Sequence, residues 1–119
     1  MAITFNTDQI DGLIGTTING VYARIQSVIV KKYDATTDPD VAAYWMCLYD
    51  VVLHASAVKR NASGEYPEWG NRLNSRQIDH FTCTYAPTRN SNPYAQAYAD
   101  LKAKLAAGGS PIASSIADA

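Results

Sequence analysis

Hydrophobic and polar residues alternate along four segments of the chain. These segments are 1–6, 21–32, 41–58 and 79–85. A period of two predicts β-strands, and the abundance of valine, isoleucine and tyrosine in these segments favours the same interpretation. In segment 21–32 the alternation places Ile25 and Ile29 on one face and Val28 and Val30 on the other. The pattern predicts a mainly β domain that begins with a short edge strand.

Segment 41–58 is apolar on both faces. One face carries Trp45, Cys47, Tyr49, Val51 and Leu53, and the other carries Tyr44, Met46, Leu48 and Val52. A strand with one face in water shows a cleaner alternation, so we expect this strand to be covered on both sides. A helix would cover one face, and a second sheet or a neighbouring subunit would cover the other. A helix over 41–53 is an alternative, because continuous apolar runs are ambiguous.

Residues 93–107 have the features of a helix at both ends. Asn92 is a suitable N-cap, and Pro93 fits the first helical position because its missing N–H costs nothing there. Gly108-Gly109 favours termination, and Pro111 prevents resumption. One face repeats apolar residues with the helical period. This stripe consists of Tyr94, Ala97, Tyr98, Leu101 and Leu105. We expect it to pack on the sheet, with Asp100 and Lys104 on the opposite face.

Together these patterns predict a mainly β, α+β fold. We expect a small antiparallel β-sandwich or half-barrel with one C-terminal α-helix. Residues 1–20 form an N-terminal strand and arm, and residues 21–107 form the β domain, which includes the helix 93–107. Residues 108–119 are rich in glycine, serine and alanine, and predict a flexible or partner-contacting tail.

Composition narrows the class of protein. The chain has 119 residues and a net charge of -1, so charge gives no reason to expect a nucleic-acid partner or an anionic membrane. No apolar run reaches the roughly 18 residues that a membrane-spanning helix needs. Two cysteines are too few for a disulfide scaffold. Eight tyrosines and two tryptophans are many for this length, and aromatic residues are enriched at protein interfaces.

The candidate chemical groups do not form a recognisable site. Cys47, His54, His80 and Cys83 lack the spacing of a zinc site, because each neighbouring Cys/His pair points to opposite faces of its strand. A Cys47–Cys83 disulfide would require their two strands to be neighbours in register. No nucleophile lies next to a histidine, and the carboxylates fall in turns. We therefore expect no catalytic residue, no metal and no cofactor, and a protein that is not an enzyme.

Several motifs resemble a known group of proteins. They are Ile3-Thr4-Phe5-Asn6, Tyr22-Ala23-Arg24-Ile25, Phe81-Thr82-Cys83-Thr84-Tyr85 and the helix that begins Asn92-Pro93-Tyr94 and continues to Lys102. In this order they resemble small virion proteins encoded among the tail and neck genes of tailed double-stranded DNA bacteriophages. Segments 59–76 and 108–119 depart from the shorter members of that group.

The resemblance implies a structural component of a phage tail, baseplate or neck. Such a protein acts by oligomeric assembly, which we expect to form a ring. Its partners are further copies of itself and other virion proteins. Its location is the virion, which is assembled in the cytoplasm of the bacterial host.

The interface residues that we expect lie on three segments. They are Tyr44, Met46, Leu48, Tyr66, Trp69, Ile112 and Ile116. An alternative function is a carbohydrate-binding module for host attachment, in which Tyr66 and Trp69 form a platform for a sugar ring. Exposure of Trp69 in the assembled oligomer would favour that alternative.

Overall fold

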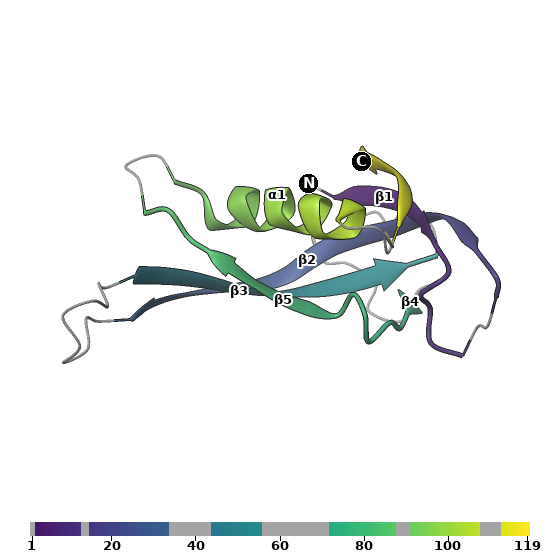
Figure 1. The fold of residues 1–119 in the computed structure, drawn as a ribbon, viewed down its shortest axis with the longest axis horizontal. Helices are drawn as coiled ribbons and strands as arrows, with labels where there is room; N and C mark the ends of the chain where they lie inside the picture. The colour runs from purple at the N-terminus through teal and green to yellow at the C-terminus, as the bar shows by residue number, and fades with distance from the viewer. Residues whose placement is uncertain (1, 13–14, 34–43, 56–71, 88–90, 108–112) are drawn as a thin grey trace, which may run out of the picture.

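A computed structural model of the chain describes residues 2–12, 15–33, 44–55, 72–87, 91–107 and 113–119. It contains six strands and one helix (Figure 1). In chain order these are β1 (Ile3–Thr7), β2 (Ile18–Tyr33), β3 (Tyr44–His54), β4 (Arg72–Leu73), β5 (His80–Thr84), α1 (Pro93–Ala106) and β6 (Ser114–Asp118). The predicted class, mainly β with one C-terminal helix, is confirmed.

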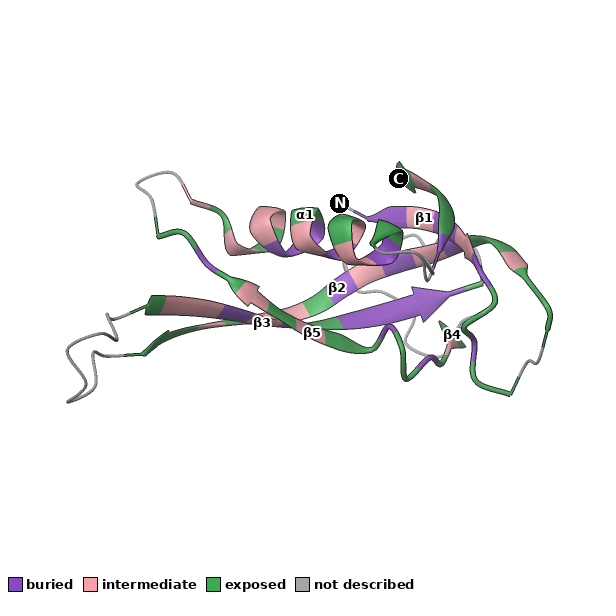
Figure 2. Ribbon diagram, viewed as in Figure 1, coloured by how far each residue is buried: buried purple, intermediate pink, exposed green. Residues whose placement is uncertain are grey.

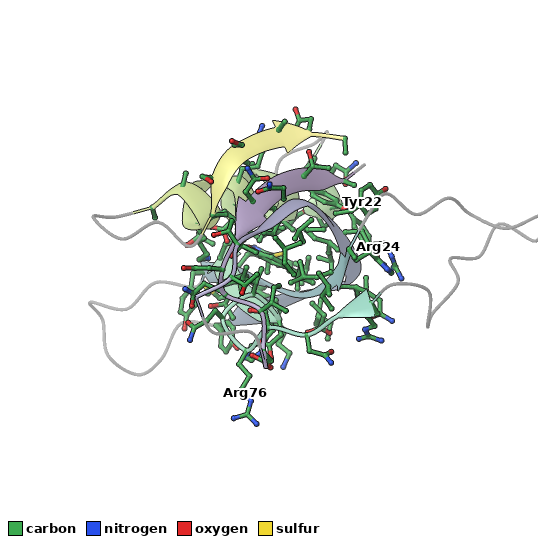
Figure 3. All side chains as sticks on the ribbon, turned by 90° about the vertical axis from the view of Figure 1, so that its right-hand side faces the viewer. Tyr22, Arg24 and Arg76 are labelled. Atoms are coloured by element: carbon green, nitrogen blue, oxygen red, sulfur yellow. The ribbon has the colours of Figure 1, made fainter. Side chains whose placement is uncertain are left out.

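The described strands form one antiparallel sheet. Its order is β4-β3-β2-β1-β6, and β5 pairs with β3 at Met46–Asp50, further along the edge that also holds β4. The helix lies along one side of β2, β3 and β5 (Figure 1). Seen end-on, the strands curl around the side chains of the core (Figure 3), which corresponds to the half-barrel alternative. The described strands contain no second sheet of the kind that a sandwich requires.

The core fills the space between the sheet and α1. Buried residues run along the inner sides of β1, β2, β3 and the helix (Figure 2). Among its largest fully buried members are Phe5, Tyr49, Leu53 and Leu101. Because β3 and the helix stripe supply much of this cluster, the helix is held against the sheet mainly by apolar burial.

The N-terminal and C-terminal strands differ from the sequence-based expectation. Strand β1 is not at an edge, because it pairs with β2 on one side and with β6 on the other. Residues 114–118 form β6 within the same chain, where the sequence predicted a flexible or partner-contacting tail. The backbone N–H of Ala119 donates to the carbonyl of Ala2 at 2.9 Å, and Ala113 is buried. Backbone pairing therefore forms a strand from a segment in which hydrophobic and polar residues alternate little.

Strand β2 contains a β-bulge at Gln26. Ile25 lies opposite Val51 on β3, but Ser27 lies opposite the very next residue, Asp50, so Gln26 has no counterpart. An extra residue reverses the alternation beyond it, since the side-chain period of a strand is two. Val28 and Val30 consequently pack against the core, and Ile29 is 52% exposed. The expectation that Ile29 shares the face of Ile25 was wrong.

The helix begins as predicted. The side-chain oxygen of Asn92 accepts hydrogen bonds from the backbone N–H groups of Tyr94 and Ala95, at 3.0 and 3.3 Å. Four members of the predicted stripe, Ala97, Tyr98, Leu101 and Leu105, are buried. Tyr94 is 44% exposed, so its predicted place in the core was wrong. It lies in the first turn of the helix, directly after Pro93. The helix ends at Ala106, and Gly108-Gly109 falls outside the described residues.

Candidate functional site

The sheet has an outer face, which is the face turned away from α1 along the distal half of the β2–β3 hairpin. We define this outer face by Ile29, Tyr33, Tyr44, Met46 and Leu48. Cross-strand pairing brings these residues together, because Ile29 lies opposite Leu48 and Tyr33 lies opposite Tyr44. Their sequence neighbours Val28, Val30, Trp45 and Cys47 belong to or pack against the core. Side chains alternate across a strand, so the five defining residues point the other way.

The outer face exposes large apolar side chains. Tyr33 is 41% exposed and Tyr44 is 45% exposed, while Met46 and Leu48 are half-buried. The Tyr33 and Tyr44 rings stack with their centroids 5.0 Å apart and an angle of 12° between their planes. With Ile29, Met46 and Leu48, they form a mainly apolar strip, in which the exposed Lys31 lies between Ile29 and Tyr33 on β2. Contiguous exposed apolar surface of this kind marks interaction sites.

A shallow hollow of about 150 Å³ lies at the proximal end of the strip. Its lining comes from three neighbouring strands. The lining residues are Ser27, Ile29, Leu48, Tyr49, Asp50, His80, Phe81 and Thr82. This volume is below the roughly 300–1,000 Å³ of pockets that enclose small-molecule ligands. The hollow suits one protruding side chain better than a bound metabolite.

Polar groups border the outer face at its proximal end. The Ser27 hydroxyl donates a 2.8 Å hydrogen bond to Asp50 Oδ2. His80, the cross-strand neighbour of Asp50, places Nδ1 2.9 Å from Asp79 Oδ1. Lys31 is exposed on the same face, four residues further along β2 than Ser27. At about 3.3 Å per residue, the acidic and basic groups of this face are roughly 13 Å apart along the strands.

The structure describes four of the seven predicted interface residues, and three of these four lie on the outer face. Tyr44, Met46 and Leu48 lie together on the outer face. Ile116 lies on β6 and packs against the chain's own core. The predictions for Tyr66, Trp69 and Ile112 fall outside the described residues, and with them the platform of the carbohydrate hypothesis.

Sequence reasoning missed two members of the outer face. Ile29 was displaced from its predicted face by the bulge at Gln26, and Tyr33 lies just beyond the end of the strand predicted over 21–32. The signal for the bulge was the pair of adjacent polar residues, Gln26 and Ser27, inside an otherwise alternating apolar strand. Such a break in phase is compatible with a bulge, although it does not specify which of the two residues is the extra one.

A polar cluster on the inner side connects the sheet to the helix. The Tyr49 hydroxyl donates to Asp100 Oδ2 at 2.6 Å, and Lys104 forms an ion pair with the same carboxylate. Lys104 also donates to the Thr82 carbonyl at 2.6 Å and lies 5.4 Å from the centre of the Phe81 ring. Burial and the hydrogen bond to Asp100 raise the pKa of Tyr49 well above its ordinary value. These groups satisfy one another, so the cluster fixes the helix to β3 and β5, and the prediction that Asp100 and Lys104 lie on the face opposite the sheet was wrong.

Cys47 and Cys83 are direct cross-strand neighbours, so the condition that we set for a disulfide is met. Both are nevertheless free thiols. Burial is the main cause that raises the pKa of each thiol, and it brings the pKa of Cys83 to about 11. Thiols that stay protonated at neutral pH are poor nucleophiles and poor metal ligands.

The histidines do not join the thiols. His54 is buried and its Nε2 accepts a 3.3 Å hydrogen bond from Arg24 Nε, while His80 is exposed. Within the described ranges, no group of three or more His, Cys, Asp or Glu side chains is placed to hold a metal ion. None of the described helical residues belongs to a helix long and apolar enough to cross a membrane.

The outer face is therefore the candidate functional site among the described residues. Its exposed groups are mainly apolar and aromatic, with basic Lys31 and acidic Asp50 at separate positions. Comparison of the chain with protein-family models, with curated proteins and with solved structures found no match.

Proposed function

We propose that this chain is a structural subunit of a tailed-phage virion, in the tail, baseplate or neck, and that it functions by assembling with copies of itself and other virion proteins. The observation that carries the proposal is the outer face. Ile29, Tyr33 and Tyr44 are exposed together on one side of the sheet, and such apolar patches are often functional. An assembling subunit covers such a surface when it meets its neighbour.

The chemistry of the described residues supports assembly over catalysis. Asp100 is held by Tyr49 and Lys104, and Asp50 accepts from Ser27. The paired thiols are protonated at neutral pH because burial raises the pKa of both. A general base or nucleophile needs a pKa and a position suited to its substrate. The carboxylates of Asp50 and Asp100 are instead used in contacts within the fold.

The direct test has two parts. Light scattering of the purified full chain across a concentration series measures whether it associates, and negative-stain electron microscopy shows whether the product is a closed ring. Mass spectrometry of particles purified on a density gradient, from a lysate of the phage that encodes the chain, measures whether it is a stoichiometric virion component. Its absence from such particles would contradict the virion role, and a monomer at every concentration would contradict self-assembly.

The control for this test is a variant that leaves the fold intact. Removal of residues 109–119 is unsuitable, because it deletes β6 and the buried Ala113. Ile29→Arg is better suited, because the side chain is more than half exposed and lies on the outer face. We expect this variant to keep its melting midpoint within about 2 °C while it loses association, since exposed substitutions usually change stability by less than about 0.5 kcal/mol.

A further inference from the structure

We propose that the proximal part of the outer face, around Ile29 and Leu48, packs against the same surface of a second copy about a two-fold axis that runs across the strands at the level of these two residues. This inference rests on the proposed function and names the surface through which one pair of subunits meets. It gives an aligned sheet-on-sheet contact, which is a common way for β-sheets to bury apolar faces. The same patch is used on both copies, as in most symmetric dimers.

The apolar residues are placed for such a contact. Ile29 and Leu48 are cross-strand neighbours, so both lie at the axis and each meets its own counterpart. Ile29 protrudes, with 52% of its surface exposed, and it borders the hollow of about 150 Å³ lined by Leu48 and Thr82.

The charges on the outer face have the complementary arrangement that this axis requires. Lys31 lies two residues from Ile29 toward the distal end of β2, and Ser27 lies two residues from it in the other direction, opposite Asp50. A two-fold axis across the strands makes the strands of the second copy run in the opposite direction to those of the first. Lys31 of one copy therefore lies over Ser27 of the other, and Asp50 is on the neighbouring strand about 4.8 Å to the side, within reach of the lysine side chain. The contact occurs twice, so both lysines and both aspartates are paired.

The area of the contact indicates how tightly the two copies bind each other. Three strands about 4.8 Å apart and seven residues of about 3.3 Å give a flat footprint of roughly 300 Å². Stable interfaces bury about 800 Å² per partner. We therefore expect a weak, concentration-dependent pair in solution, which becomes effective when several copies are held together in an assembly.

Charge exchange between two variants tests the pairing. In a pair of Lys31→Glu chains, the introduced carboxylate of each copy faces the native Asp50 of the other. In a pair of Asp50→Lys chains, the introduced ammonium group faces the native Lys31. Like charges therefore meet in both cases, and each variant alone should associate at least tenfold more weakly than the native chain.

An equimolar mixture of the two variants restores the complementarity. In the mixed pair, the introduced carboxylate of one chain faces the introduced ammonium group of the other, and the native Lys31 faces the native Asp50. We expect sedimentation equilibrium to show recovered association in the mixture. Salt at 1 M should reduce this recovery by screening.

The matched control is Arg76→Glu, which makes the same change of charge as Lys31→Glu. Arg76 is exposed and extends away from the sheet (Figure 3), so association should be unchanged. Circular dichroism of every variant checks that the fold is retained, which is expected because Lys31, Asp50 and Arg76 are all exposed.

The outcomes separate the pairing from the proposed function. Recovery in the mixture, with no effect of Arg76→Glu, supports the pairing. If the chain associates but Lys31→Glu, Asp50→Lys and their mixture behave like the native protein, this pairing is overturned, and assembly proceeds through another surface. If the native chain is monomeric up to millimolar concentration, both the pairing and self-assembly are overturned.

Discussion

The phenolic oxygen of Tyr98, on the buried face of α1, accepts a 2.8 Å hydrogen bond from the backbone N–H of Ile25, the residue directly before the bulge in β2. The helix thus supplies an acceptor at the point where the register of β2 and β3 shifts. Tyr98 is 7% exposed, so this bond is shielded from water. Because the bulge turns Ile29 outward, the contact between Tyr98 and Ile25 also supports the geometry of the outer face.

Tyr98→Phe is expected to destabilise the protein by about 1–3 kcal/mol, because it leaves a buried N–H without this acceptor while the ring stays in place. Tyr98→Ala should cost at least about 3 kcal/mol, because it also leaves a cavity between helix and sheet. Urea denaturation of both variants measures these differences. Tyr94→Phe, on the same helix but 44% exposed, is the control and should change little. Equal midpoints for Tyr98→Phe and the native chain would show that the hydrogen bond adds no stability.

The helix could be predicted from the sequence because its signals are local. Asn92 accepts from the first-turn N–H groups, and the buried stripe repeats with the helical period. Strands β1, β2, β3 and β5 were also predictable from alternation, including the face of β3 that carries Cys47, Tyr49 and Val51. In these elements each residue's role depends mainly on neighbours within a few positions, so pattern and structure agree.

The outer face could be predicted only in part, because the residues on it depend on the β-bulge in β2, which the local sequence pattern does not reveal. Tyr44, Met46 and Leu48 were assigned to an interface because both faces of their strand are apolar. Ile29 was predicted to share the face of Ile25, since the sequence does not show that Gln26 lacks a counterpart on β3. Likewise β6 is held by backbone bonds to β1, and a segment of serine and alanine gives no alternation that would reveal them.

Cysteine substitution tests the reversal of faces beyond the bulge. In a Cys47→Ala/Cys83→Ala background, Ile29→Cys should react with a maleimide reagent at nearly the rate of a free thiol, because this position is 52% exposed. Val28→Cys should react at least tenfold more slowly, because it packs against the core. The two positions are adjacent, so each serves as the control for the other. Faster labelling at Val28 would place the extra residue elsewhere in β2.

Asn92→Ala tests the start of the helix. The change removes the acceptor for the N–H groups of Tyr94 and Ala95, so we expect a loss of about 1 kcal/mol, within the usual range of about 0.5–2 kcal/mol for N-caps. Asn92→Asp keeps a capping oxygen and should retain most of the native stability. Thermal unfolding of the three proteins measures the differences. A loss in Asn92→Asp as large as that in Asn92→Ala would show that the cap is not what stabilises this end.

The raised pKa of the Cys83 thiol predicts that the protein loses stability in alkaline solution. Burial is the main cause that raises its pKa from 9.0 to about 11, and the negative charge of Asp100 adds to this effect. Between these values the unfolded chain releases the proton while the folded chain retains it, so the unfolded state is favoured increasingly as pH rises. The contribution of Cys83 is thus fully present below about pH 9 and is lost by about pH 11. The urea midpoint of the native chain should fall more steeply over this interval than that of Cys83→Ala. This comparison cancels the titration of lysines and tyrosines, which both proteins share. Parallel curves for the two proteins would mean that Cys83 titrates at its ordinary pKa in the folded state.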